Sequence, residues 1–145
     1  MVDVATVRRL LEIIEKRLAR LERVARTSLE AYMADEDLQD RVERNFEVAI
    51  QACIDLALHI LADFPEPVPE TYREVFRSLV RHSIIDDQLG RRLEVMAGFR
   101  NLLAHGYADI IPEKVHRSLS ELGDIRSFVA SAVAYLQRTG ALPQS

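Results

Sequence analysis

The chain has 145 residues and a formal net charge of −4, with 48% hydrophobic and 29% charged residues. This length and balance suit a single domain, residues 1–145, built on one core. A net negative charge argues against a protein that coats DNA non-specifically, but it leaves room for a local basic cleft. We therefore expect no DNA partner.

Cysteine usage and hydropathy bear on the compartment. The single cysteine, Cys53, excludes an internal disulfide and a Cys-based zinc site, and its apolar neighbours favour a small core residue. Arg8 and Arg9 interrupt any secretory signal pattern, and no apolar run is long enough to cross a bilayer. We expect a cytoplasmic protein with no membrane partner.

Apolar residues at spacings of three and four predict helices along the whole chain. The first predicted helix covers about residues 4–33, and the aspartates of 34–40 end it and cap the next. The second covers about residues 38–63. It is apolar over most of its circumference, so it should lie at the centre of the fold.

One narrow polar strip runs along the second predicted helix. It contains Arg44, Gln51, Asp55 and His59, the last three at successive i,i+4 steps. The strip either faces solvent or lines a cleft, and in the second case Gln51 and Asp55 are candidate cleft residues.

Three further helices are predicted after the Pro-rich segment 64–70. The sequence TYRE (71–74) predicts a capping box for a short third helix that ends near residue 80. Asp86 should cap a fourth helix that ends near Ala104. No strand pattern appears, so the expected fold is an all-α antiparallel bundle of about five helices.

The fifth predicted helix follows the turn 108–112, with Pro112 in its first turn, and ends at 138–140. A stripe of apolar residues at helical spacing should face the core. Its members are Val115, Leu119, Leu122, Ile125, Val129, Val133 and Leu136.

The fourth predicted helix carries a charged residue on its apolar side. Arg100 projects into the middle of an arc formed by Leu89, Leu93, Met96, Phe99 and Leu103. Burying a guanidinium without partners is costly. Arg100 should therefore either pair with a buried acid, for which Asp55 is a candidate, or face a protected polar cleft.

The sequence HGY (105–107) should end this helix. Gly106 is expected at the C-terminal cap with a positive φ angle, which would place His105 at the helix end and Tyr107 on the turn with an accessible hydroxyl. Arginine holds phosphate through two hydrogen bonds, and histidine takes or gives protons near neutral pH. RNA cleavage without a metal or other cofactor needs these two functions. The ribose 2′-OH is itself the nucleophile, so no serine or cysteine is required.

The sequence RNLLAHGY, read as Arg-x4-His-x-Tyr, resembles the signature of the HEPN superfamily and of its HepT toxins. The stretches ERNFEVAIQACIDLALHI, PETYREVF and RRLEVMAGFRNLLAHGY extend the resemblance over most of the chain. It implies a homodimeric HEPN-like bundle and a metal-independent endoribonuclease, the toxin of a type VII HepT/MntA toxin–antitoxin system. A two-fold axis would bring two Arg–His pairs together and bury apolar surface.

The resemblance also assigns residues. Arg100 and His105 match the catalytic pair, and Asn101 matches the polar position that orients the site. Tyr107 matches the tyrosine that the MntA nucleotidyltransferase modifies with AMP, and RNA would be the substrate.

Two other interpretations remain open from the sequence. The chain could be a non-catalytic helical partner of a minimal nucleotidyltransferase, or a structural bundle in which Arg100 forms a buried salt bridge. No metal site is expected, because His59, His82 and His116 have no ligand spacing with one another or with His105.

Overall fold

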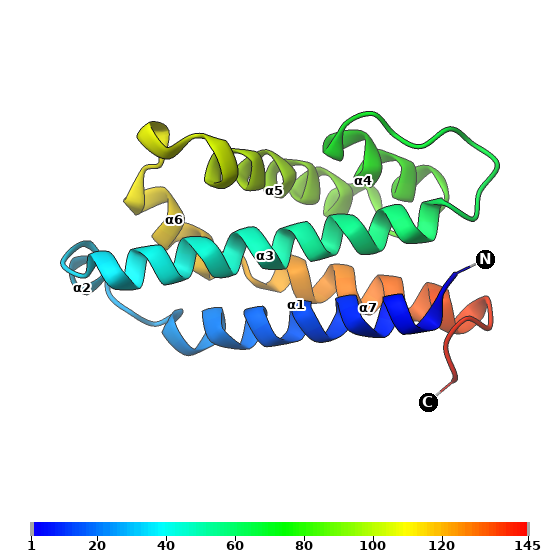
Figure 1. The fold of residues 1–145 in the computed structure, drawn as a ribbon, viewed down its shortest axis with the longest axis horizontal. Coiled ribbons are helices and arrows are strands. Elements are labelled where there is room, and N and C mark those ends of the chain that lie inside the picture. Colours follow the sequence, from blue (N-terminus) through cyan, green and yellow to red (C-terminus); the bar gives the residue numbers. More distant parts are fainter. Residues whose placement is uncertain (1, 145) are drawn as a thin grey trace.

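This computed structural model describes residues 2–144, in which helices joined by loops make up the fold and no strand occurs (Figure 1). The all-α prediction is confirmed. Within these residues, no helix combines the length and apolar character needed to span a bilayer. The elements are α1 (Val4–Val24), α2 (Leu29–Met33), α3 (Glu36–Leu61), α4 (Tyr72–Arg81), α5 (Asp87–His105), η1 (Tyr107–Asp109), α6 (Pro112–Ser118), η2 (Leu119–Glu121) and α7 (Gly123–Arg138), where η marks a 3-10 helix.

Helix α3 is the central element, as its nearly all-round apolar surface predicts. It packs against α1 on one side and against α4 and α5 on the other, and it also contacts α7 (Figure 1). Cys53 is fully buried in α3, and burial raises the pKa of its thiol above the ordinary range. A buried, protonated thiol is a core residue and a poor nucleophile.

Side-chain caps begin the helices where the sequence predicts them. The Asp35, Thr71 and Asp86 side chains accept backbone N–H groups from Leu38, Glu74 and Leu89 at 3.0, 3.2 and 2.7 Å. The predicted capping box at Thr71 is only half formed. The Glu74 carboxylate accepts from Arg77 at 2.9 Å on the helix surface and makes no hydrogen bond with the Thr71 N–H within residues 2–144.

The first predicted helix is wrong in its length. It ends at Val24, and α2 is a separate short helix that begins at Leu29. Ser28 adopts an extended backbone conformation, and its hydroxyl accepts the Ala31 N–H at 3.1 Å. A serine that caps a new helix competes with continuation of the old one, and apolar spacing does not reveal that competition.

The fifth predicted helix is also wrong, since it is divided into α6, η2 and α7. The Ser118 and Ser120 hydroxyls donate to the carbonyl oxygens of Lys114 and Arg117 at 3.0 and 2.7 Å. The helix tightens to 3-10 geometry here, which shifts the buried side of α7. Phe128 and Ala132 are fully buried, in place of the predicted Val129 and Val133.

The buried side of α7 leads to a prediction about stability. Phe128→Ala should lower the free energy of unfolding by about 3–5 kcal/mol, because it empties a fully buried aromatic site against Phe76. Val133→Ala should cost less than about 1.5 kcal/mol, because Val133 is only half-buried. Urea denaturation measures both. Equal losses of unfolding free energy for the two variants would mean that α7 buries the residues expected of one uninterrupted helix.

Candidate active site

Arg100 lies on α5 where this helix meets α3 and α4. Its guanidinium carbon is 5.6 Å from the centre of the Tyr72 ring, at the start of α4. Its Nη1 donates to Asn101 Oδ1 at 3.3 Å. Among residues 2–144 it makes no ion pair, so the buried salt bridge to Asp55 that the sequence allowed does not form. An aromatic face and a neutral amide therefore hold this cation.

The Arg100 side chain borders a hollow of about 220 Å³ between α1, α3 and α5. Leu10 and Ile13 form its α1 wall. Its α3 wall contains both polar and apolar residues, namely Arg44, Glu47, Val48, Gln51, Ala52 and Asp55. Gln51 Nε2 donates to Asp55 Oδ1 at 2.8 Å, which fixes the orientation of the amide. The polar strip thus lines a cleft at this point.

His59 departs from the rest of the strip. Its Nε2 accepts the backbone N–H of Asp3 at 2.9 Å, so it fastens the beginning of α1 to α3. This contact gives His59 a structural explanation.

Two buried polar atoms at the hollow have no partner within residues 2–144. They are the Nε of Arg100, a donor, and the Oε1 of Gln51, an acceptor. An unsatisfied buried polar atom typically costs about 1–3 kcal/mol of folding free energy. Such a cost is most easily explained where a ligand completes the hydrogen bonds.

His105 is the last residue of α5, and its side chain is exposed. The predicted positive φ at Gly106 is wrong, since its φ is −103°. The glycine instead avoids a close contact with Leu102. A Cβ atom here would lie 2.6 Å from Leu102 Cδ1 and 3.0 Å from the Leu102 carbonyl oxygen, to which the Gly106 N–H donates at 2.7 Å.

Tyr107 follows at the first position of η1, and its side chain is 80% exposed. The turn that carries it is closed by a hydrogen bond from the Asp109 N–H to the Gly106 carbonyl at 2.8 Å. An accessible hydroxyl on a short, fixed turn is what the sequence predicts for this residue.

The structure gathers Arg100, Gln51 and Asp55 around one hollow. Asn101 is exposed and is linked to this group only through its hydrogen bond with Arg100, and His105 lies apart from them. Arg100 and His105 lie on one continuous helix, about 7.5 Å apart along its axis and about 140° apart around it. One chain therefore presents a phosphate-binding group and an imidazole that do not converge. Tyr72 is the site residue that the sequence did not predict, because its contact with Arg100 joins two separate helices.

The remaining histidines have structural contacts. His82 stacks on Phe64 with ring centres 3.9 Å apart, and its Nε2 lies 3.0 Å from Glu66 Oε2. His116 Nε2 lies 2.6 Å from the Thr27 carbonyl oxygen. No group of three or more His, Cys, Asp or Glu side chains suited to a metal ion occurs in residues 2–144.

Comparison with known proteins gives consistent matches. A family model described as "Ribonuclease HepT-like" matches residues 14–132. The tRNA nuclease HepT of Aphanizomenon flos-aquae is 32% identical over 76% of this chain and 75% of its own. The mRNA nuclease HepT of Shewanella oneidensis is 29% identical over 81% and 94%. A solved structure of a tri-AMPylated HEPN toxin from Shewanella oneidensis, in complex with an MNT antitoxin, is similar at a TM-score of 0.81. It is 26% identical, over 92% of this chain and 99% of that one.

The close approach at Gly106 predicts a position-specific cost. Gly106→Ala should destabilise the protein by about 1–3 kcal/mol, because the new methyl group meets Leu102. Gly123→Ala is the matched control, since nothing lies within 4 Å of a Cβ there. The control should be neutral or stabilise by up to about 1 kcal/mol. Chemical denaturation compares the two, and a neutral Gly106→Ala would contradict the packing argument.

Proposed function

Because the chain belongs to the ribonuclease HepT-like family, we propose that it is the toxin of a toxin–antitoxin pair and cleaves RNA with Arg100 and His105. The family is a ribonuclease family, which confirms the prediction of an enzyme that acts on RNA. The proposal adds metal-independent internal cleavage, a site formed at a homodimer interface, and control by a nucleotidyltransferase.

The observation that carries the proposal is the unpaired guanidinium of Arg100. It has no carboxylate partner within the described residues, its Nε is unsatisfied, and it borders a hollow that Gln51 and Asp55 line. A phosphodiester would supply the missing acceptor and the opposite charge. Asn101 accepts from Nη1 and so would restrict the orientation of the guanidinium fork.

His105 would perform the proton transfers. In cleavage, the ribose 2′-oxygen attacks phosphorus and loses its proton to a base. The bond from phosphorus to the 5′-oxygen then breaks, and that oxygen receives a proton from an acid. The two steps use two proton-transfer groups, whereas one chain brings a single exposed His105 to this end of α5. A second copy of the chain, related by a two-fold axis, would supply the other imidazole.

Tyr107 would be the regulatory residue. The similar toxin of Shewanella oneidensis is tri-AMPylated and bound to an MNT antitoxin. We propose that an MntA-like nucleotidyltransferase transfers AMP to the exposed Tyr107 hydroxyl. Each added AMP brings bulk and negative charge two residues from His105, where it would repel an RNA phosphate.

Loss of either proposed catalytic group should remove cleavage without unfolding the protein. Arg100→Ala and His105→Ala should each lower the rate of RNA cleavage by about 10²–10⁴-fold. Arg91→Ala is the control, because Arg91 lies on the same helix in an exposed ion pair with Asp87. Cleavage of labelled RNA by purified protein, with and without a metal chelator, measures the effect. Circular dichroism checks the fold.

Three results would contradict this assignment. Full activity of both alanine variants would exclude the site, and loss of activity with chelator would exclude the metal-independent mechanism. A folded wild-type protein that cleaves no RNA, yet assembles with its nucleotidyltransferase, would favour the non-catalytic partner role.

Tyr107 has a separate test. Wild-type protein co-expressed with its partner nucleotidyltransferase should gain mass in whole adenylate units, and Tyr107→Phe should gain none. Tyr135→Phe is the control, because Tyr135 is half-buried on α7 against Phe64 and Arg138. Intact-mass spectrometry reads all three proteins. If the Tyr107→Phe protein still gains adenylate, another residue is the modification site.

A further inference from the structure

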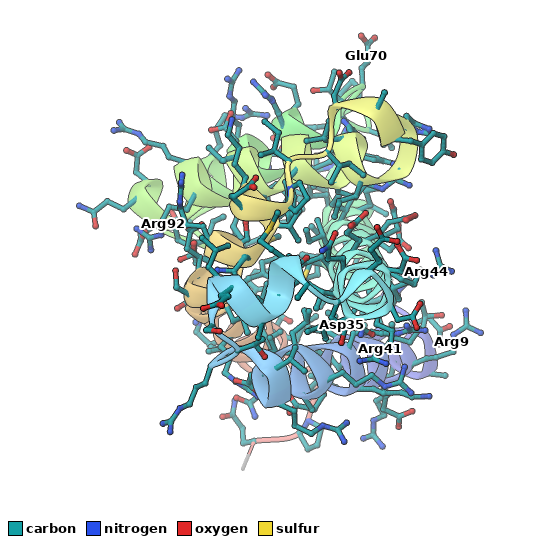
Figure 2. All side chains as sticks on the ribbon, turned by 90° about the vertical axis from the view of Figure 1, so that its left-hand side faces the viewer. Arg9, Asp35, Arg41, Arg44, Glu70 and Arg92 are labelled. Carbon is teal, nitrogen blue, oxygen red and sulfur yellow. The ribbon has the colours of Figure 1, made fainter. Side chains whose placement is uncertain are left out.

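Five arginines line one side of the seam between α1 and α3. We call them the arginine stripe, and they are Arg17, Arg20 and Arg23 on α1 and Arg41 and Arg44 on α3. Arg20, Arg23 and Arg41 surround a hollow of about 280 Å³ together with Asn45. Figure 2 shows Arg41 and Arg44 on the same side of the molecule as Arg9, and Arg92 on the opposite side.

The charges on α1 are separated by side. At 100° per residue, the three arginines of the stripe fall within about 120° of arc, and Glu15 and Glu22 point about 150° away from its centre. Both glutamates bind Arg126 of α7, at 3.2 and 2.6 Å. Two of the three acids of α1 are thus engaged on the side of the helix that faces away from the stripe.

The stripe itself has little internal neutralisation. Within residues 2–144, Arg17, Arg20, Arg23 and Arg41 have no carboxylate partner, and Arg44 has only an exposed contact with Glu47 at 3.5 Å. Burial, together with the positive charges of Arg20 and Arg44, lowers the pKa of Arg17. Like charges held together in this way are stabilised by a polyanion that spans them.

The stripe also continues into the candidate active site. Arg44 lines the hollow that Arg100 borders. Arg41 lies one helical turn away from Arg44 and lines the neighbouring hollow. Asn45 connects the two helices there, since it accepts from Arg17 Nη1 at 3.2 Å. Along α3, Arg41 lies about 15 Å from Gln51, a distance that a few nucleotides of extended RNA can cover.

We propose that the arginine stripe binds the phosphate backbone of the RNA strand on one side of the phosphodiester held at Arg100. This inference rests on the proposed function and adds a backbone-binding track to it. Contacts to phosphate carry no base specificity, so the track would raise the affinity for longer RNA and leave the cleavage preference to the site itself. It also explains how a chain with a net charge of −4 can hold a polyanion.

The test compares two triple variants that remove the same charge. Arg20→Gln/Arg23→Gln/Arg41→Gln alters the stripe, and Arg91→Gln/Arg117→Gln/Arg138→Gln alters arginines on α5, α6 and α7. A third protein with lysine at positions 20, 23 and 41 keeps the charge of the stripe. Fluorescence anisotropy measures binding of single-stranded RNA of about 16 nucleotides, made non-cleavable by 2′-O-methyl groups, over a range of salt concentrations. Cleavage of an unmodified RNA of about 4 nucleotides is measured in parallel.

The stripe variant should bind the longer RNA at least about fivefold more weakly at low salt. The slope of log affinity against log salt should fall by about 2, which corresponds to three lost phosphate contacts on a single strand. The lysine variant should retain most of the affinity, the control triple should stay near wild type, and cleavage of the short RNA should be unchanged.

Two outcomes would overturn the inference. Equal weakening by both glutamine triples would assign the effect to overall charge. Unchanged RNA affinity of the stripe variant, with loss of assembly with the purified nucleotidyltransferase, would make the stripe a protein-docking surface. Failure of the proposed function is seen separately, because wild-type protein would then bind the methylated RNA without cleaving the unmodified one.

Discussion

The structure depends on how a guanidinium is accommodated on the apolar side of a helix. Arg100 points from α5 toward α3, where most neighbouring positions are occupied by core residues. A carboxylate partner would have neutralised it and closed the space. The Tyr72 ring covers the cation instead, and the amide of Asn101 accepts one N–H, which leaves another donor unsatisfied. The hollow beside α1, α3 and α5 places this charge next to the polar side chains of Gln51 and Asp55, and a buried charge without polar surroundings would be costly.

Helix α3 serves both the core and this hollow. Its apolar residues occupy most of the circumference, and the helix contacts all six other α-helices of residues 2–144, so its position is tightly determined. The remaining strip presents Gln51 and Asp55, whose mutual hydrogen bond leaves the Gln51 Oε1 facing no protein donor within the described residues. A rigid central helix is a suitable support for such a site, because its side chains have few alternative positions.

The distribution of charge over the surface of this protein says more about anion binding than its net charge does. Arg126 of α7 binds Glu15 and Glu22 of α1, while the arginines on the opposite side of α1 have no carboxylate partner within residues 2–144. An acidic chain can in this way present a basic surface next to the group proposed to hold the scissile phosphate. Net charge therefore describes non-specific association poorly when the helices sort their charges by face.

Local chemistry in the sequence determined the all-α class, the central place of α3, the caps at Asp35, Thr71 and Asp86, and the exposed turn at Tyr107. Each of these depends on residues within about one or two helical turns of one another. Tertiary structure and side-chain competition decided the rest. Serine hydroxyls divide two predicted helices and shift the buried face of α7 to Phe128, and Leu102 limits the space at Gly106. The packing of α4 on α5 brings Tyr72 over Arg100, and the pairing of α1 with α3 aligns their arginines. The sequence could not predict either contact, because the spacing of residues along one helix does not show which residues of another helix lie beside it.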